Sequence, residues 1–109
     1  MAIKISVSPR VKFPIEGSFK NDEGADEPFK FSLLCKRLDA EEHRERAKAD
    51  IDYIATMVEL TEAWFDVKDD SGKPLEYSED GLRALLKRPG LATLAYFTYV
   101  RESGAKAKN

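Results

Sequence analysis

The stretch Trp64-Phe-Asp-Val-Lys-Asp-Asp-Ser-Gly-Lys-Pro-Leu-Glu-Tyr-Ser78 decides how this chain folds, because it separates one long helical pattern from two shorter ones. Two adjacent aspartates are followed by Ser71, Gly72 and Pro74, and residues of these types favour turns. The last residue, Ser78, is of a type that commonly begins a helix. We therefore predict that the chain reverses here and that this stretch directs the helices that follow.

Length and composition predict a single soluble domain over residues 1–109. The chain is 42% hydrophobic and 35% charged, as in soluble globular proteins, and it has no apolar run near the ~20 residues of a membrane span. A net charge of −2 argues against strong attraction to nucleic acid or to an anionic membrane. The one cysteine, Cys35, excludes an internal disulfide and suits the cytoplasm.

Residues 1–37 are predicted to form the β part of an α+β fold. Apolar and polar residues alternate over 3–7, over 11–15 and over 29–33, which is the period of a half-buried strand. We predict a small antiparallel sheet of two to three strands, in which 11–19 pairs with 29–35. Pro14 lacks an N–H group, so this strand is expected to lie at a sheet edge or to have that side free. The acidic segment 20–28 is predicted to be a long, mobile hairpin loop.

Residues 38–104 are predicted to be helical, with three helices at about 39–63, 78–88 and 89–103. Asp39 and Glu42 have the spacing of a capping box, and an apolar stripe follows from residue 51 to residue 58. Residues 40–50 are almost all polar, so we expect this half of the first helix to project into water. Pro89 separates the second helix from the third, and residues 105–109 are predicted to be a flexible tail.

Residue types that commonly carry chemistry do not form a recognisable site in this sequence. Cys35 fits a small buried hydrophobe better than a nucleophile, and His43 has no second ligand at a helical spacing. The acidic residues from Asp66 to Asp70 do not fit a calcium loop, because Lys68 falls at a ligand position and the glycine comes one place late. We therefore predict a protein that is not an enzyme and that uses no cofactor and no metal.

The last predicted helix is apolar on most of its sides, so a single neighbouring element could not cover it. It is either central in the fold, which we favour, or part of its aromatic surface contacts another chain. Large rigid side chains contribute most to interface energies. The candidate protein-binding residues are therefore aromatic: Trp64, Tyr96, Phe97 and Tyr99.

Several small motifs occur in an order that resembles the tail assembly chaperones of long-tailed bacteriophages and prophages. Val-Lys-Phe-Pro-Ile at 11–15 and Phe-Lys-Phe at 29–31 precede an acidic helix, and Trp-Phe-Asp-Val at 64–67 leads into the acidic turn. A helix, a Pro-Gly break and a final helix follow from residue 82, and the chain ends in Ala-Lys-Ala-Lys-Asn. The resemblance covers the chain from about residue 10, and residues 1–9 have no counterpart in it.

The resemblance implies a non-enzymatic role in tail morphogenesis. Members of that family bind the tape-measure protein while tail-tube protein assembles around it, in the cytoplasm of the bacterial host, and they are absent from the mature virion. Self-association is a further possibility. The alternative is a bacterial adaptor or regulatory protein-interaction domain unrelated to phage tails. Contact of such a domain with nucleic acid through Lys87 and Arg88 is disfavoured, because too few basic residues lie near them.

Overall fold

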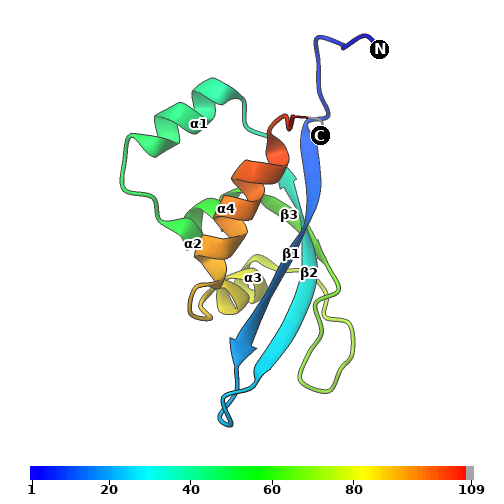
Figure 1. Cartoon of the computed structure of the whole chain (residues 1–109), viewed down its shortest axis with the longest axis vertical. Helices are drawn as coiled ribbons and strands as arrows, with labels where there is room; N and C mark the ends of the chain where they lie inside the picture. Colours follow the sequence, from blue (N-terminus) through cyan, green and yellow to red (C-terminus); the bar gives the residue numbers. More distant parts are fainter. Residues whose placement is uncertain (108–109) are drawn as a thin grey trace.

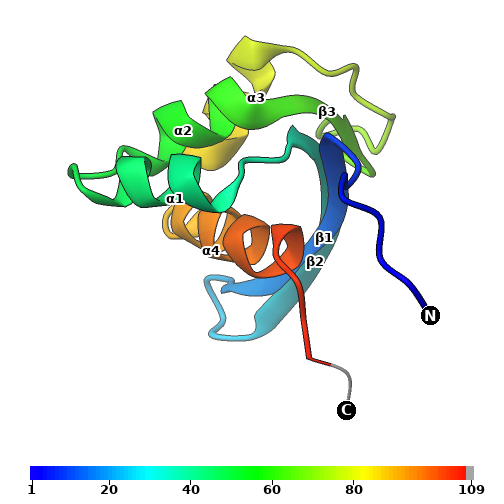
Figure 2. The same cartoon turned by 90° about the horizontal axis from the view of Figure 1, so that it is seen from above.

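The computed structural model describes residues 1–107 and shows an α+β fold, as predicted. A three-stranded antiparallel sheet has the order β1-β2-β3, and the helices lie on one side of the curved sheet (Figures 1 and 2). The strands are β1 (Arg10–Lys20), β2 (Asp26–Lys36) and β3 (Thr61–Phe65). The helices are α1 (Ala40–Ala47), α2 (Tyr53–Leu60), α3 (Glu79–Leu86) and α4 (Leu91–Ser103).

The long β1–β2 hairpin confirms the predicted pairing of 11–19 with 29–35. Alternate residues of both strands enter the core, and six of them are less than 9% exposed: Val11, Phe13, Ile15, Phe31, Leu33 and Cys35. β1 is an edge strand, as Pro14 predicted. The N–H of Arg37 donates to the carbonyl of Pro9, and the N–H of Asn21 donates to the carbonyl of Ala25. The residues that exchange backbone hydrogen bonds between β1 and β2 are therefore the odd-numbered ones, and the even-numbered residues direct these groups away from the partner strand. Pro14 therefore directs its nitrogen away from β2.

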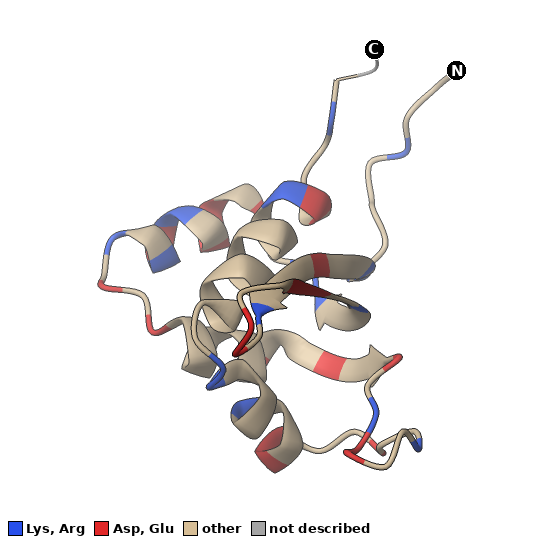
Figure 3. Cartoon of the chain, turned by 60° about the horizontal axis from the view of Figure 1, so that its bottom comes forward, with Lys and Arg blue, Asp and Glu red and all other residues tan. Residues whose placement is uncertain are grey.

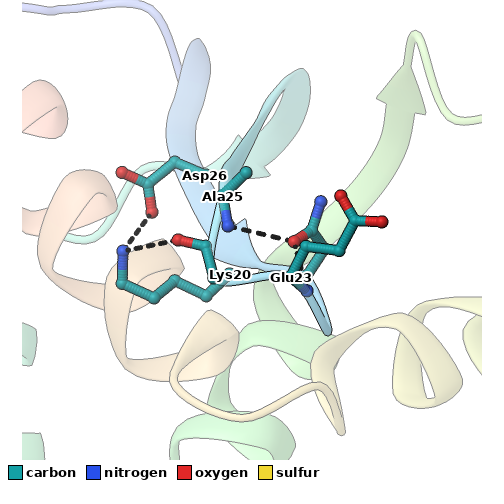
Figure 4. Close-up of polar contacts among 6 residues, drawn as sticks. Lys20, Glu23, Ala25 and Asp26 are labelled. Atoms are coloured by element: carbon teal, nitrogen blue, oxygen red, sulfur yellow. Dashed lines mark hydrogen bonds and ion pairs between the residues drawn. The ribbon is translucent and has the colours of Figure 1, made fainter.

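The hairpin loop is shorter than predicted. Strand pairing continues to Lys20 and Asp26, so the connection spans only residues 21–25 instead of 20–28. The Asn21 side chain accepts from the N–H groups of Glu23 and Ala25, and Gly24 adopts a left-handed φ of 81°. The Lys20 ammonium lies 3.0 Å from an Asp26 carboxylate oxygen, which joins the two strand ends (Figure 4). The last residue of β1 and the first residue of β2 thus form an ion pair beside the loop.

The predicted strand at 3–7 is wrong. These residues extend away from the body of the protein as an N-terminal arm (Figures 1 and 2), and Ile3, Ile5 and Val7 are 96%, 109% and 68% exposed. Alternation gave the residues a strand-like pattern, but a strand also needs a neighbour with which to pair. Within this chain the arm has no such neighbour among residues 1–107.

The single helix predicted over 39–63 is also wrong, because the chain divides it into α1, α2 and β3. Asp39 and Glu42 form the predicted capping box, yet every residue of α1 is at least partly exposed, so packing does not extend this helix. Asp52 then accepts from the N–H of Ala55 and begins α2 as a new N-cap. From Thr61 the chain pairs with β2, and this pairing overrides the helical pattern.

An irregularity in β3 lets two of its residues face the core. Cys35 lies opposite Thr61 and Leu34 opposite Ala63, so Glu62 is an extra residue in the ladder. Thr61 and Trp64 are three residues apart and would face opposite sides of a regular strand. Because of the bulge, both are buried, at 7% exposed each.

The predicted reversal within 64–78 is confirmed and begins directly after β3. Asp66 has a left-handed φ of 63° and directs the chain out of the sheet. Asp69 accepts from the N–H groups of Ser71 and Lys73, and Gly72 completes the turn with a φ of 83°. Ser78 then caps α3 by accepting from the N–H of Gly81.

The two C-terminal helices are confirmed within shorter bounds than 78–88 and 89–103. The Pro89–Gly90 break lies between α3 and α4, and Gly90 adopts a φ of 79° directly before α4. Residues 105–107 of the predicted tail lack regular structure, and residues 108–109 lie outside the described residues.

Candidate protein-binding surface

The four predicted binding residues divide into three buried rings and one exposed ring. Trp64, Tyr96 and Tyr99 are 7%, 6% and 0% exposed and belong to the core. Phe97 is 55% exposed. A candidate surface on α4 therefore has Phe97 as its aromatic residue.

Tyr99 joins α4 to the end of β2 from inside the core. Its hydroxyl donates to the carbonyl of Lys36 at 2.7 Å and accepts from the N–H of Leu38 at 3.1 Å. Its ring centroid lies 5.8 Å from that of Phe13. Burial raises the pKa of the Tyr99 hydroxyl above its ordinary value. Tyr99 thus satisfies two backbone groups at the start of the β2–α1 connection, and its role is structural.

Trp64 anchors the 66–78 segment to the sheet. Its indole N–H donates to the carbonyl of Leu75 at 2.8 Å, and its ring meets that of Tyr77 edge to face at 5.3 Å. A Cβ atom added at Gly81 would lie 2.9 Å from the indole, so α3 packs closely against the ring. The sequence pattern placed Trp64 correctly at the pivot of the chain, but its ring faces inward.

Three aromatic rings meet where the start of α2 packs against α4. The Tyr53 ring lies 5.9 Å from Phe97 and 5.2 Å from Tyr96, and the last two rings lie 5.5 Å apart. Tyr96 forms the buried base of this cluster, while Tyr53 is partly buried and Phe97 is open to solvent. Val100, one turn further along α4, is 39% exposed and extends the apolar area.

A groove continues from this aromatic cluster toward the corner between α3 and α4. It has a volume of ≈ 390 Å³, and Tyr53 belongs to its wall. Two parts of its lining derive from sequence features already described, namely the Asp52 cap of α2 and the Pro89–Gly90 break before α4. We refer to the groove and the cluster together as the α2–α4 surface, which is formed by Ile51, Tyr53, Ile54, Thr93, Phe97 and Val100.

Charged residues lie at the borders of the α2–α4 surface and not in its centre. Figure 3 shows most of α4 without charge, whereas both signs alternate along α1. Of the thirteen residues of α4, the charged ones are Arg101 and Glu102 at its end. Lys87 and Arg88 line the groove at the corner between α3 and α4, and Asp52 lines it at the start of α2. An apolar centre with charged borders is typical of a surface that binds another polypeptide.

Helix α1 stands beside this surface with few contacts to the rest of the fold, as expected for residues 40–50 (Figures 1 and 2). The Arg46 guanidinium donates to both carboxylate oxygens of Glu59 in α2, at 3.0 and 2.8 Å. This bond raises the pKa of Arg46 and lowers that of Glu59. The His43 ring packs 5.8 Å from Tyr99.

Cys35 is buried, as predicted, with an exposed fraction of 0%. Burial raises the pKa of its thiol to about 12, and the sulfur lies 3.4 Å from the hydroxyl oxygen of Thr61. The thiolate, which is the reactive form, is therefore disfavoured at neutral pH. Across residues 1–107, His, Cys, Asp and Glu do not gather in groups of three or more that could hold a metal ion.

A second concave region lies at the far end of the sheet. β3 pairs with β2 only from Ser32 to Cys35, so the other half of β2 has no strand paired with it on that side among the described residues. The resulting cavity has a volume of ≈ 310 Å³. We refer to it as the open-edge cleft, and its apolar side chains are Phe19, Phe29, Phe31, Val67, Leu85 and Leu91.

Sequence reasoning found Phe97 and the neighbouring Tyr96 but missed Tyr53. Tyr53 seemed to lie inside one long helix, and the signal that would have found it is Asp52, whose side chain begins a new helix directly before it. The open-edge cleft had no sequence signal, since it depends on where β3 ends.

Comparison of the chain with protein-family models, with curated proteins and with solved structures finds no match. The helices within residues 1–107 are all too short or too polar to cross a membrane.

Proposed function

We propose that this chain is a non-enzymatic tail assembly chaperone that binds the tape-measure protein during phage tail morphogenesis. The observation that carries the proposal is the exposed Phe97 ring beside Tyr53, which lines the groove between α2 and the start of α4. The order of motifs from residue 11 to the C-terminus supports the assignment to phage tails. Binding of tail-tube protein, action in the host cytoplasm and absence from the virion follow from the same resemblance and belong to the proposal.

The α2–α4 surface suits an amphipathic helix as its ligand. From Gly90 to Val100 it extends about 15 Å along α4, at 1.5 Å per residue, which is the length of about three helical turns. A helix presents apolar residues at spacings of three and four positions, and three such residues fit this length. Tape-measure proteins are long and helical, so they offer many segments of this kind to a chaperone.

The proposal predicts that a gene for a long, helical tape-measure protein lies directly downstream of this one. It is tested by measuring binding of segments of that protein with isothermal titration calorimetry. Replacing Phe97 with alanine removes the exposed ring and is expected to weaken binding by at least about 30-fold, as for a central interface residue. Folding should be almost unchanged, because half of this side chain is already in contact with water.

Phe65→Ala is the matched control. Phe65 is also partly exposed, at 38%, but it lies in β3, where the Lys12 ammonium sits 3.9 Å from its ring centroid. Its replacement should change the affinity by less than about two-fold, in line with ordinary surface substitutions. Failure of every tape-measure segment to bind would refute the chaperone role and favour the alternative adaptor function. Equal losses in both variants would refute the α2–α4 surface as the binding site.

A further inference from the structure

The geometry points to a second interaction, in which the N-terminal arm of one copy of this chain adds a strand to the open-edge cleft of another copy. The arm consists of residues 3–7, Ile-Lys-Ile-Ser-Val. The side chains of Ile3 and Ile5 are fully in contact with water, and that of Val7 is mostly so. Alternation of this kind allows the apolar residues to enter a core while Lys4 and Ser6 remain outside. The apolar residues of the open-edge cleft are different from those of the α2–α4 surface.

The cleft exists because one strand is shorter than its neighbour. β3 ends opposite Ser32, and the left-handed conformation of Asp66 directs the following chain out of the sheet. Residues 26–31 of β2 therefore present a free edge about 20 Å long, at about 3.3 Å per residue. An extended arm of five residues spans about 17 Å and fits this length.

The backbone of this edge has hydrogen-bonding groups available. Odd-numbered residues of β2 bond to β1, so the N–H and C=O groups of Lys30 and the C=O group of Pro28 point toward the cleft. Within the described part of the chain, the segment after Asp66 makes no backbone hydrogen bond to Lys30. Peptides bind sheet edges through such groups, with alternate side chains entering pockets.

The side chains beneath the edge match the arm in polarity. Phe29 and Phe31 face the helical side of the sheet, with Val67, Leu85 and Leu91 forming the rest of the apolar lining. An arm strand laid beside β2 places Ile3, Ile5 and Val7 over these groups. The burial of three exposed side chains then favours association.

The arm cannot fill the cleft of its own chain. Val7 precedes Arg10 by three residues and so lies at most about 11 Å from it. Arg10 is opposite Lys36, and Lys30 lies six residues further along β2, a distance of about 20 Å. Figure 1 shows the arm and the hairpin turn at opposite ends of the sheet. A second copy is therefore the occupant that brings this arm to this cleft.

The proposal predicts self-association in analytical ultracentrifugation of the full chain. Reciprocal exchange of arms gives a closed dimer of twice 12.3 kDa, and one-way exchange gives larger open chains. Replacing Ile3 and Ile5 together with lysine should shift the protein to monomer, with at least a 30-fold weaker association. The control, Lys4→Ala with Ser6→Ala, changes the opposite side of the arm and should associate as the wild type does. A wild type that stays monomeric up to millimolar concentration overturns the proposal.

A substitution on the cleft side identifies the surface that receives the arm. Lys30→Pro removes an N–H group that points into the cleft, and the same strand already holds Pro28 in an equivalent orientation. This variant should lose association, whereas Lys30→Ala, which keeps the N–H group, should retain it. A circular dichroism spectrum verifies that each variant is folded. Association that persists in folded Lys30→Pro overturns the proposal.

A spin label locates the arm directly. The label on Ala2→Cys in one sample should broaden the amide signals of Lys30 and Val67 in a second, isotopically labelled sample after mixing. The native Cys35 is buried and does not compete for the label. Broadening confined to Phe97 and Val100 would assign any association to the α2–α4 surface and overturn arm exchange.

Discussion

The inner and outer sides of α4 use the same kinds of residues for different purposes. Tyr99 faces the sheet, is fully buried and bonds two backbone groups at the end of β2. Phe97, two positions earlier, is more than half exposed and lies beside the rings of Tyr53 and Tyr96 at the edge of the core. Aromatic content alone therefore does not identify a binding residue, and position around the helix decides which ring is available to a partner.

The inner side of α4 follows helical spacing closely. Its buried residues recur at intervals of one, three and four positions and contact β1, α2 and α3. They are Leu91, Ala92, Ala95, Tyr96, Thr98 and Tyr99. This side completes the core, so a second chain can approach only the outer side.

The largest expected effect is that of Tyr99→Ala, which should lower the free energy of unfolding by about 3–5 kcal/mol. The substitution opens a cavity next to Phe13 and leaves the Lys36 carbonyl and the Leu38 N–H without their partner. Since small domains are stable by about 5–15 kcal/mol, the protein should be close to unfolding. Urea denaturation followed by circular dichroism measures the change.

Phe97→Ala provides the comparison for this experiment and should lower stability by less than about 1 kcal/mol. Similar losses for both variants would contradict the division of α4 into an inner and an outer side. Tyr99→Phe separates the hydroxyl from the ring and should cost about 1–3 kcal/mol through the two unsatisfied backbone groups.

Local patterns predicted the hairpin, the turn at 69–72 and both C-terminal helices, because the residues that form each of them are close in sequence. Two failures have a common physical cause. The arm at 3–7 alternates like a strand but has no partner in its own chain, and 61–65 continues a helical pattern but pairs with β2. Pairing between distant segments decides such cases, and a pattern within one segment does not contain that information.

The candidate site was predictable in part. Phe97 could be selected as an aromatic residue on an unusually apolar helix, but Tyr99 satisfied the same criterion, and Trp64 was selected with them as a large rigid side chain. The burial of these last two depends on Leu75, Lys36 and Leu38, whose backbone groups they bond and which are 11 to 63 residues away in the sequence. Specific contacts over such distances appear only in the folded structure.

A smaller effect is expected for Trp64→Phe, which keeps most of the buried ring but removes its N–H group. The Leu75 carbonyl then loses its partner, and stability should fall by about 1–2 kcal/mol. The loss should be local, so amide hydrogen exchange measured by NMR should accelerate more in 67–77 than in α4. Equal acceleration throughout the chain would show that Trp64 supports the whole core and not this segment in particular.

The smallest effect concerns α1, the part of the fold with the least buried surface. Arg46 holds the pKa of Glu59 below its ordinary value, so the pair stabilises the folded state above the unfolded pKa, near 4.5, and this contribution is lost as the pH falls through the lower, folded pKa. The Glu59 side chain is 61% exposed, so solvent screening limits the contribution to roughly 0.5 kcal/mol or less.

Arg46→Ala should therefore leave the unfolding free energy almost unchanged at pH 7 while hydrogen exchange in 40–47 becomes faster. In the wild type, hydrogen exchange in 40–47 should also become faster as the pH falls and Glu59 becomes protonated. The measured rates are first corrected for the intrinsic pH dependence of amide exchange. A loss above about 1 kcal/mol in Arg46→Ala would mean that α1 supports the core through its contact with Tyr99, and α1 would then belong with the inner side of α4.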